Sequence, residues 1–323
     1  MIKISVCVIS YNQEDYIEQC LRSIATQKGN FILEIVIRDD YSTDSTYNIC
    51  QDFIKNFSGQ NVEFKLLKAT KNLGANKNIL EVLKNCTGEF IAFCEGDDYW
   101  CDTNKLNIQL EQATLQPDID FFVHPAFYLH SNGELTKERW PLQEKKISMQ
   151  ADIFKASWQF APTASYFIRA KVIDRLPAWF ANATIGDIYL EIYAVENKVA
   201  MLDKYMSVYR YLSPTSWSLS LSKKKTNIYE KKIEHYINFL ECLSCVEKDY
   251  THISDSINIK RFSIKFQLAQ LYVLTNQKCK AQQIAQEILN SQYIRSLKKR
   301  IFLKFILSSF LFDFLQKFKM LLR

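Results

Sequence analysis

Glycine is scarce in this chain, and that scarcity excludes two common classes of nucleotide-binding protein. Only seven glycines occur among the 323 residues, and no two of them are closer than eight positions. The motifs G-x-G-x-x-G and G-x-x-x-x-G-K-[ST] need glycines at shorter spacing, because the backbone must approach phosphate groups closely. The sequence therefore excludes a Rossmann dehydrogenase and a P-loop kinase.

Net positive charge is missing from most of the chain. The whole sequence carries +6, but residues 295–323 hold eight basic residues and one acid, so residues 1–294 carry −1. A nucleic-acid-binding protein would show basic residues spread over its body. We therefore expect no nucleic-acid partner, and we assign the basicity to one terminal element.

The basic segment 295–323 also lacks a long hydrophobic run. Its longest uncharged stretch, Phe305–Phe312, is far shorter than the roughly 20 apolar residues that span a bilayer. Apolar bulk between basic flanks favours an amphipathic helix that lies on an anionic membrane. The alternative is an ordinary helix that packs on its own protein or in a homo-oligomer. We expect peripheral membrane contact.

The nine cysteines are odd in number, most stand in apolar contexts, and no signal peptide precedes them. These features predict reduced thiols in a cytoplasmic protein. Cys242 and Cys245 form one C-x-x-C, but neither a second pair nor a suitably spaced histidine accompanies it. Two thiols on one helix are therefore favoured over a zinc or redox site.

Hydrophobic residues make up 48% of the chain, enough to bury a core, and their spacing predicts an α/β fold. Short runs rich in Ile and Val alternate with helical patterns, which is typical of a mostly parallel sheet with helices on both faces. From about residue 223 onward the pattern is helical. The expected strands are 2–9, 33–37, 62–67, 90–94, 120–129 and 164–168, and the expected helices are 14–27, 44–57, 75–85, one after Asp187, 259–274 and 280–289.

Polar segments follow the first four expected strands. The carboxyl ends of parallel strands meet at one edge of a sheet, so these segments should bring five carboxylates together with almost no positive charge. Crowded carboxylates repel one another unless a cation joins them, and oxygen ligands at this density favour Mg²⁺ or Mn²⁺ shared with phosphate oxygens. The sequence therefore predicts a divalent-metal site that holds a diphosphate. The five carboxylates are Asp39, Asp40, Glu95, Asp97 and Asp98.

The same segments also have a structural explanation. Residues 39–46 include types that cap helices, and Asp97 with Asp98 can form a solvated turn. Each explanation is reasonable for one segment alone. The four segments together favour the metal site.

Five motifs of this chain stand in an order and spacing that resemble a known family. They are Ser10-Tyr11-Asn12, residues 39–46, Asn72-x-Gly74, Glu95-Gly96-Asp97-Asp98, and Tyr99-Trp100 followed by Lys105-Leu106 and Gln109. Together they resemble a family 2 glycosyltransferase with the GT-A fold, strongly over residues 1–115 and moderately to about residue 220. The resemblance implies a GT-A domain over 1–220, with a nucleotide-binding half (1–115) and an acceptor half (116–220), before a helical region (221–323).

The resemblance implies roles for residues of the nucleotide-binding half. Asp39 would accept a hydrogen bond from the uracil N3–H of a UDP-sugar, with Asp40 behind it. Asp97 and Asp98 would bind Mn²⁺ or Mg²⁺, and Glu95 stands where the family has the first Asp of a D-x-D element. The other donor-binding candidates are Ser10, Tyr11 and Asn12 beside the base, and Asn72, Gly74 and Lys77 beside the diphosphate, where the family more often has Arg than Lys77.

The resemblance also implies a catalytic base. Inverting members need a carboxylate that removes the proton of the acceptor hydroxyl, usually within a Glu-Asp pair before a helix. Gly186-Asp187 stands there, so we assign the base to Asp187, with Glu191 as the second candidate; the alternative is that Asp187 is only an N-cap. Arg210 matches a donor-side segment of the family, and Leu212 stands where the family often has His.

These features predict a metal-dependent inverting glycosyltransferase that acts in cell-surface polysaccharide synthesis. It would move a sugar from a UDP-sugar to a hydroxyl of a glycan or lipid-linked glycan. The absence of Q-x-x-R-W argues against a processive polymerase. Two other classes stay open: a non-catalytic assembly protein with the same fold, and a sugar nucleotidyltransferase, although the latter favours a Gly-rich basic loop that is missing here.

Overall fold

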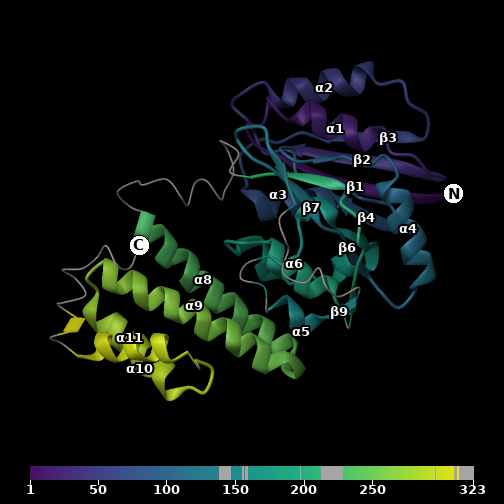
Figure 1. Cartoon of the computed structure of the whole chain (residues 1–323). Coiled ribbons are helices and arrows are strands. Elements are labelled where there is room, and N and C mark those ends of the chain that lie inside the picture. Colours follow the sequence, from purple (N-terminus) through teal and green to yellow (C-terminus); the bar gives the residue numbers. More distant parts are fainter. Residues whose placement is uncertain are drawn as a thin grey trace. The chain divides into compact units, whose positions relative to one another are not determined.

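The computed structural model describes residues 1–137, 147–154, 156, 159–196, 198–211, 228–294, 296–308 and 311–312. Contacts divide the chain into two compact units, unit 1 (residues 1–220) and unit 2 (residues 221–323) (Figure 1). Leu212, Arg295 and residues 313–323 of the basic segment lie outside the described residues.

Four parallel strands form one half of the main sheet in unit 1, in the order β3-β2-β1-β4. They are β1 (Ile2–Ser10), β2 (Phe31–Asp39), β3 (Val62–Leu67) and β4 (Phe90–Phe93). In Figure 1, α1 (Ile17–Ala25) and α2 (Thr46–Asn56) lie above this half and α3 (Ala75–Leu83) lies below it. Helices follow β1, β2 and β3 in the chain and cover both faces of the strands, so the predicted alternation of strands and helices is confirmed. Burial on both faces also explains why these strands are continuous apolar runs in the sequence.

The other half of the main sheet mixes strand directions. β10 (Phe167–Arg169) runs antiparallel between β4 and β6 (Phe121–Val123), and β11 (Lys198–Met201) and β9 (Ile147–Met149) complete the sheet. The strand expected at 164–168 begins later, because Thr163–Ser165 forms a 3₁₀ turn, η1. The remaining elements are α4 (Lys105–Leu115), α5 (Gln150–Ile153), α6 (Asp187–Ala194), η2 (Ala170–Arg175) and η3 (Ala178–Asn182).

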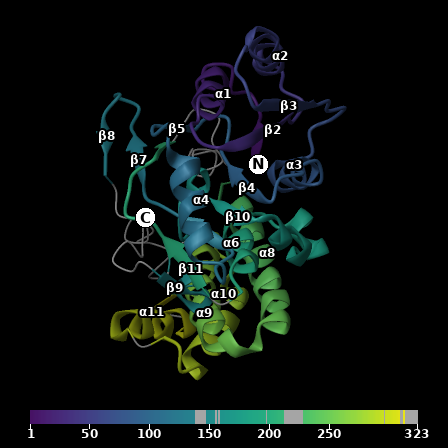
Figure 2. The same ribbon diagram turned by 90° about the vertical axis from the view of Figure 1, so that its right-hand side faces the viewer.

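A second sheet of unit 1 has the order β5-β12-β7-β8. Its strands are β5 (Tyr99–Trp100), β12 (Ser207–Arg210), β7 (Ala126–Leu129) and β8 (Leu135–Thr136), three of which are labelled in Figure 2. The prediction of one strand over 120–129 is wrong, since β6 and β7 belong to different sheets. Pro125 between them has no N–H to donate, so a continuous ladder cannot pass through it.

Trp100, Lys105 and Gln109 form a buried link between α4 and η1. The indole N–H of Trp100 donates to the Ala164 carbonyl at 2.9 Å, and Gln109 Nε2 donates to the Ser165 carbonyl at 2.8 Å. Lys105 donates to Gln109 Oε1 at 2.8 Å and lies 4.0 Å from the Trp100 ring centroid, and burial lowers its pKa to about 7. These residues of the fifth motif therefore hold η1 beside the second sheet.

Unit 2 is built of helices that pack in chain order. They are α8 (Ile228–Asp249), α9 (Ser254–Leu274), α10 (Lys278–Asn290) and α11 (Leu297–Leu307), with η4 (Thr251–Ile253) between the first two. The helices predicted at 259–274 and 280–289 are confirmed, with earlier starts. The chain reverses between them at Asn276, whose φ is 59°, a left-handed value that Asn tolerates better than most residues.

The described part of the basic segment packs within unit 2. Leu303 and Ile306 of α11 have no exposed surface, and Gln282 Nε2 donates to the Ile306 carbonyl at 3.2 Å. The exposed residues of α11 include both apolar and basic side chains, namely Leu297, Lys298, Ile301 and Lys304. No helix within the described ranges is long and apolar enough to cross a membrane.

Candidate active site

The polar segments meet at the carboxyl edge of the main sheet, as predicted. Ser10 and Asp39 are paired at the ends of β1 and β2. The Asp40 N–H donates to the Ser10 carbonyl at 2.8 Å, and the Gly96 N–H donates to the Ile9 carbonyl at 2.9 Å. A Cβ at Gly96 would lie 2.4 Å from the flexible end of Gln13 and 3.0 Å from both Ile17 Cδ1 and Ser10 Cβ, so the glycine keeps this approach uncrowded. Three of the four segments are thereby joined through the end of β1.

Asp39 is held as a hydrogen-bond acceptor at this edge. Its Oδ2 accepts the Ser42 N–H at 2.9 Å, and its Oδ1 accepts the hydroxyls of Ser42 and, at 3.3 Å, Ser10. Asn12 joins the same two segments, since its N–H donates to Ser42 Oγ at 2.8 Å and its Oδ1 accepts the Thr43 N–H at 2.8 Å. These bonds orient the Asp39 carboxylate before any ligand arrives. Tyr11, 43% exposed, lies on the chain between Ser10 and Asn12.

Asp40 contacts a different part of the chain, the segment that follows β3. Its buried carboxylate forms an ion pair with Arg38 Nη1 at 2.7 Å and accepts the N–H groups of Leu73 and Gly74, the latter at 2.8 Å. Arg38 also donates to Asn78 Oδ1 at 2.7 Å. Asp40 therefore fastens the segment after β3 to the end of β2. Sequence reasoning missed Arg38, although an Arg at the end of an apolar strand and directly before two acids was the available signal.

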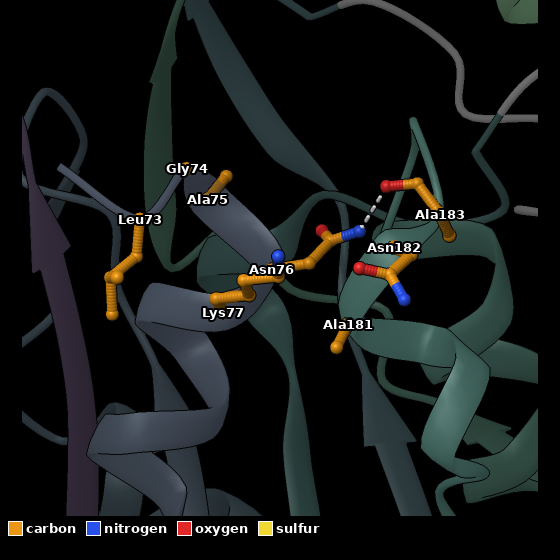
Figure 3. A pocket seen from close by; sticks show the side chains of 8 residues that line it. All are labelled: Leu73, Gly74, Ala75, Asn76, Lys77, Ala181, Asn182 and Ala183. Atoms are coloured by element: carbon orange, nitrogen blue, oxygen red, sulfur yellow. Dashed lines mark hydrogen bonds between the residues drawn. The ribbon is translucent and has the colours of Figure 1, made fainter.

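A pocket of about 280 Å³ opens at the N-terminus of α3 (Figure 3). Asn76 Nδ2 donates to the carbonyl oxygens of Ala183 at 2.6 Å and Phe180 at 3.3 Å, which holds the segment before α6 against α3. Among the predicted diphosphate-side residues, Gly74 and Lys77 line the pocket and Asn72 does not. The complete lining is Leu73, Gly74, Ala75, Asn76, Lys77, Ala181, Asn182 and Ala183. Asn76 and the 181–183 segment were not predicted from the sequence.

Four carboxyl groups act on one another electrostatically at this edge. Burial raises the pKa of Glu95 well above its ordinary value, and the charges of Asp187, Asp97 and Asp98 raise it further. Burial and the charge of Asp97 likewise raise the pKa of Asp98. Burial raises the pKa of Asp187 to about 6. Burial and mutual repulsion therefore disfavour the ionised carboxylates in the region shared by Glu95, Asp97, Asp98 and Asp187, although the N–H and the charge of Arg210 act in the opposite direction on Asp98.

A divalent cation in this region would find few ligands from the protein alone. Within the described ranges, no three His, Cys, Asp or Glu side chains are arranged to hold a metal ion. The protein would therefore supply one or two carboxylate oxygens, and a bound diphosphate would supply others, as Mg²⁺ sites commonly do. Burial and mutual repulsion raise the pKa values of Glu95 and Asp98, and a cation bound among these carboxyl groups would relieve that repulsion, so the donor set fits.

Arg210 connects the second sheet to this region. Its backbone N–H donates to Asp98 Oδ1 at 2.9 Å. Its guanidinium donates to Gln19 and lies over the rings of Tyr16 and Tyr99, 4.7 and 5.2 Å from their centroids. The main chain of Arg210 therefore orients Asp98, while its side chain anchors β12 to α1. The donor contact expected of Arg210 stays a prediction.

Glu191 and Asp187 lie one turn apart on α6 but differ in access. Glu191 has no exposed surface. Its carboxyl accepts the N–H groups of Phe160 and Ala161, at 3.0 and 2.9 Å, and the Tyr166 hydroxyl at 2.7 Å. Asp187, at the start of α6, is half-buried. Of the two candidate bases, Asp187 therefore keeps exposed surface and Glu191 does not, and the role of Asp187 as the base stays a prediction.

Glu191→Gln should make the stability of the protein less dependent on pH. Burial raises the pKa of Glu191 from 4.5 to about 8, although the hydrogen bonds it accepts act in the opposite direction. Between these values the folded protein keeps a proton that the unfolded chain releases, so the wild type loses about 1.4 kcal/mol of stability per pH unit as pH rises. Gln cannot titrate, so the variant should become progressively more stable than the wild type from about pH 4.5 to about pH 8. Thermal unfolding midpoints of both proteins across this range test it, and a difference that is constant with pH contradicts it.

Comparison with known proteins identifies the family. Residues 5–175 match the model of glycosyl transferase family 2. The chain belongs to this family. Asp187 and Arg210 lie beyond the matched residues, so their family roles depend on the motifs alone.

Relatives of this family 2 member include uncharacterized and characterized proteins. An uncharacterized protein of Mycobacterium tuberculosis is 31% identical over 222 residues, which cover 68% of this chain and 62% of the relative's length. The poly(ribitol-phosphate) beta-N-acetylglucosaminyltransferase TarS of Staphylococcus aureus is 38% identical over 102 residues, 31% of this chain and 17% of TarS. The chain thus matches less than two thirds of the length of either relative.

Solved structures confirm the expected GT-A fold. S. aureus TarS 1–349 in complex with UDP-GlcNAc has a TM-score of 0.60 at 18% identity, covering 89% of this chain and 81% of that one. The mannosyltransferase PcManGT of Pyrobaculum calidifontis, in complex with GDP-Man and Mn²⁺, has a TM-score of 0.56 at 12% identity, covering 98% and 87%. At these identities the similarity establishes the fold and nothing finer.

Proposed function

We propose that this family 2 member is an inverting, metal-dependent glycosyltransferase that moves a sugar from a UDP-sugar to a hydroxyl of a glycan or lipid-linked glycan acceptor. The observation that carries the proposal is the meeting of the preoriented Asp39 carboxylate with the charged region of Glu95, Asp97, Asp98 and Asp187 at one sheet edge. The ligands of TarS and PcManGT, UDP-GlcNAc and GDP-Man with Mn²⁺, support a nucleotide-sugar donor. Cell-surface polysaccharide synthesis is the proposed setting.

Residues 1–115 would bind the donor and residues 116–220 the acceptor. Asp39, held by Ser10 and Ser42, would accept the uracil N3–H. Asp40 would act indirectly, by holding the Leu73 and Gly74 amides beside the pocket that Lys77 lines. Asp97 and Asp98 would hold Mn²⁺ or Mg²⁺, and the cation would neutralise the charge of the departing UDP.

Asp187 would perform the proton transfer. In a single displacement, the acceptor oxygen forms its bond to the anomeric carbon while the bond from that carbon to UDP breaks, and the hydroxyl proton passes to an Asp187 oxygen. With a pKa of about 6, Asp187 is ionised at neutral pH and yet more basic than an ordinary aspartate. A base whose pKa lies near the working pH is the efficient choice.

The deciding experiment measures UDP release from a panel of UDP-sugars, together with calorimetric titration of UDP in the presence of Mn²⁺. Binding of UDP and release of UDP from at least one sugar are expected. Failure to bind UDP would favour a non-catalytic assembly protein. Pyrophosphate release from UTP and a sugar 1-phosphate would favour a nucleotidyltransferase.

We further propose a cytoplasmic protein with peripheral membrane contact through residues 295–323. Deleting this segment is a poor test, because Leu303 and Ile306 belong to the core of unit 2. Lys298→Glu with Lys304→Glu changes two exposed charges instead. Each basic residue near an anionic surface contributes about 1 kcal/mol, so affinity for anionic vesicles should fall at least about 30-fold.

Co-sedimentation with vesicles of anionic and of neutral lipid at low salt measures this effect. The matched control is Lys231→Glu with Lys248→Glu, two exposed positions on α8, which should sediment like the wild type. Equal sedimentation of all three proteins would show that the segment is only a packing element.

A further inference from the structure

One face of the second sheet gathers aromatic side chains beside the proposed active site. Paired residues of neighbouring strands lie on the same face of a sheet, and successive residues alternate between faces. Tyr209 pairs with Tyr128, and Tyr128 pairs with Thr136. Two residues further along each strand, Tyr211 and His130 come to the same face. We call Tyr128, His130, Tyr209 and Tyr211 the aromatic platform.

Ring contacts support this assignment of faces. The Tyr128 ring lies 5.3 Å from Tyr209 and 5.7 Å from Tyr211, and His130 lies 5.8 Å from Tyr211, all between centroids. His130 Nε2 is 2.8 Å from Thr136 Oγ1, which orients its ring. The Tyr211 N–H continues the ladder by donating to the Leu129 carbonyl at 3.0 Å. The platform is therefore held by strand pairing on each side, and Tyr211 is 42% exposed.

The platform is continuous with the carboxylate region. Tyr209 and Tyr211 flank Arg210, whose N–H donates to Asp98 Oδ1 at 2.9 Å. Trp100 pairs with Ser207, so it shares the face of the platform, and its indole reaches the Ala164 carbonyl of η1. The opposite face carries Arg210 and, paired together, Leu129 and Leu135. The platform thus belongs to the side of the sheet that faces η1.

The chemistry of the platform selects a neutral ligand with an apolar face. Among the described residues of this sheet and its hairpin, His130 and Glu134, which lie opposite each other, are the ionisable residues that share this face with the tyrosines, and the carboxylates of Glu134 and of the neighbouring region disfavour an anion. Pyranose rings present a patch of C–H groups on one face and hydroxyls around their rim. Aromatic rings pack well against the C–H patch, and tyrosine hydroxyls can form hydrogen bonds with the hydroxyls at the rim.

We propose that the aromatic platform is an acceptor subsite on which a pyranose ring of the glycan acceptor stacks, with Tyr211 as its most accessible ring. The proposal rests on the glycosyltransferase function proposed above and adds the residues that bind the second substrate. In this proposal, the sugar ring stacks on the second sheet next to Arg210, whose N–H binds Asp98 of the proposed metal site.

Saturation-transfer NMR tests the proposal with UDP and Mg²⁺ in every sample. The probes are the methyl β-glycosides of glucose, galactose and N-acetylglucosamine. In the wild type, both the uracil protons and the ring C–H protons of at least one glycoside should receive saturation. Tyr211→Ala should weaken glycoside affinity about tenfold and leave the UDP signals unchanged.

Control variants separate the ring from the fold. Tyr211→Phe and Tyr211→Trp keep a ring and should retain most of the glycoside affinity. His130→Ala is a second truncation on the platform and should weaken glycoside binding. Leu135→Ala removes an exposed side chain, 52% accessible, from the opposite face of the same hairpin and should have no effect. Thermal unfolding midpoints verify that each variant is folded.

The outcomes of the two proposals are distinguishable. Absence of UDP signals in the wild type would contradict the proposed function, whatever the glycosides show. Glycoside signals that persist in Tyr211→Ala, that are missing from the wild type, or that disappear together with the UDP signals would overturn the acceptor subsite. The last outcome would instead make the platform part of the nucleotide site.

Discussion

Asp98→Asn is expected to abolish sugar transfer and to remove most of the metal-dependent affinity for UDP. The substitution keeps the shape of the side chain, and the amide oxygen can still accept the Arg210 N–H that now lies 2.9 Å from Asp98 Oδ1. It removes one negative charge from the region that would hold the cation. A bound metal contributes several kcal/mol to stabilising charge in the transition state, so transfer should fall by at least about 10³-fold. Calorimetry of UDP with Mn²⁺ and a UDP-release assay measure the two effects.

The matched control for this substitution is Asp102→Asn. Asp102 is four residues away, where it forms an ion pair with the exposed Lys204 at 2.7 Å and accepts the Asn104 N–H at 2.8 Å. An amide oxygen can keep the second contact, and an ion pair with an exposed partner contributes little to stability. UDP affinity and transfer should be close to those of the wild type. Wild-type UDP affinity in Asp98→Asn would show that this carboxylate is only part of a turn.

Asp187→Asn should lower kcat while leaving the binding of the UDP-sugar nearly intact. A general base contributes typically about 10²–10⁴-fold to a rate, and an amide cannot take the proton. Because burial raises the pKa of Asp187 to about 6, the wild-type kcat should rise as pH increases through about 6 and level off above it. The variant should lose this acidic limb. Steady-state kinetics from pH 5 to pH 8 measure both effects.

Two substitutions test whether the effect belongs to Asp187. Glu191→Gln should keep most of the activity, because the Glu191 carboxyl is enclosed by Phe160, Ala161 and Tyr166. Asp174→Asn, at an exposed position of η2, should behave like the wild type. If Asp187→Asn lowers transfer less than about tenfold while Glu191→Gln removes it, the base assignment is reversed.

The position of the candidate site was predictable because it depends on local patterns. The short Ile and Val runs of β1 to β4 predict strands, the helical spacing between them predicts crossovers, and crossovers make neighbouring strands parallel. The polar residues after each strand then meet at one edge without further information. Asp39, Asp97 and Asp98 were assigned to this edge on that basis, and the registers of β1, β2 and β4 place them there.

The partners of individual carboxylates were not predictable. Asp39 and Asp40 are adjacent in the sequence, yet one accepts hydrogen bonds from the segment around Ser42 and the other forms an ion pair with Arg38 and holds Gly74. In the sequence, nothing distinguishes Glu191 from any other acidic residue of a helix, but the N–H groups of Phe160 and Ala161, about 30 positions earlier, bind its carboxyl group. Such differences depend on which distant backbone amides a folded chain brings within reach.

The amino-acid sequence by itself determined the α/β class, the edge at which the chemistry gathers and the acidic character of that edge, since each follows from side-chain periodicity and strand direction. Only the tertiary structure decided that residues 120–129 divide between two sheets, that the Glu191 carboxyl is enclosed while Asp187 keeps exposed surface, and that tyrosines about 80 residues apart share one face. Pairing of β12 with β7 is a long-range contact, and its register depends on how the whole core packs, which no local pattern of residues specifies.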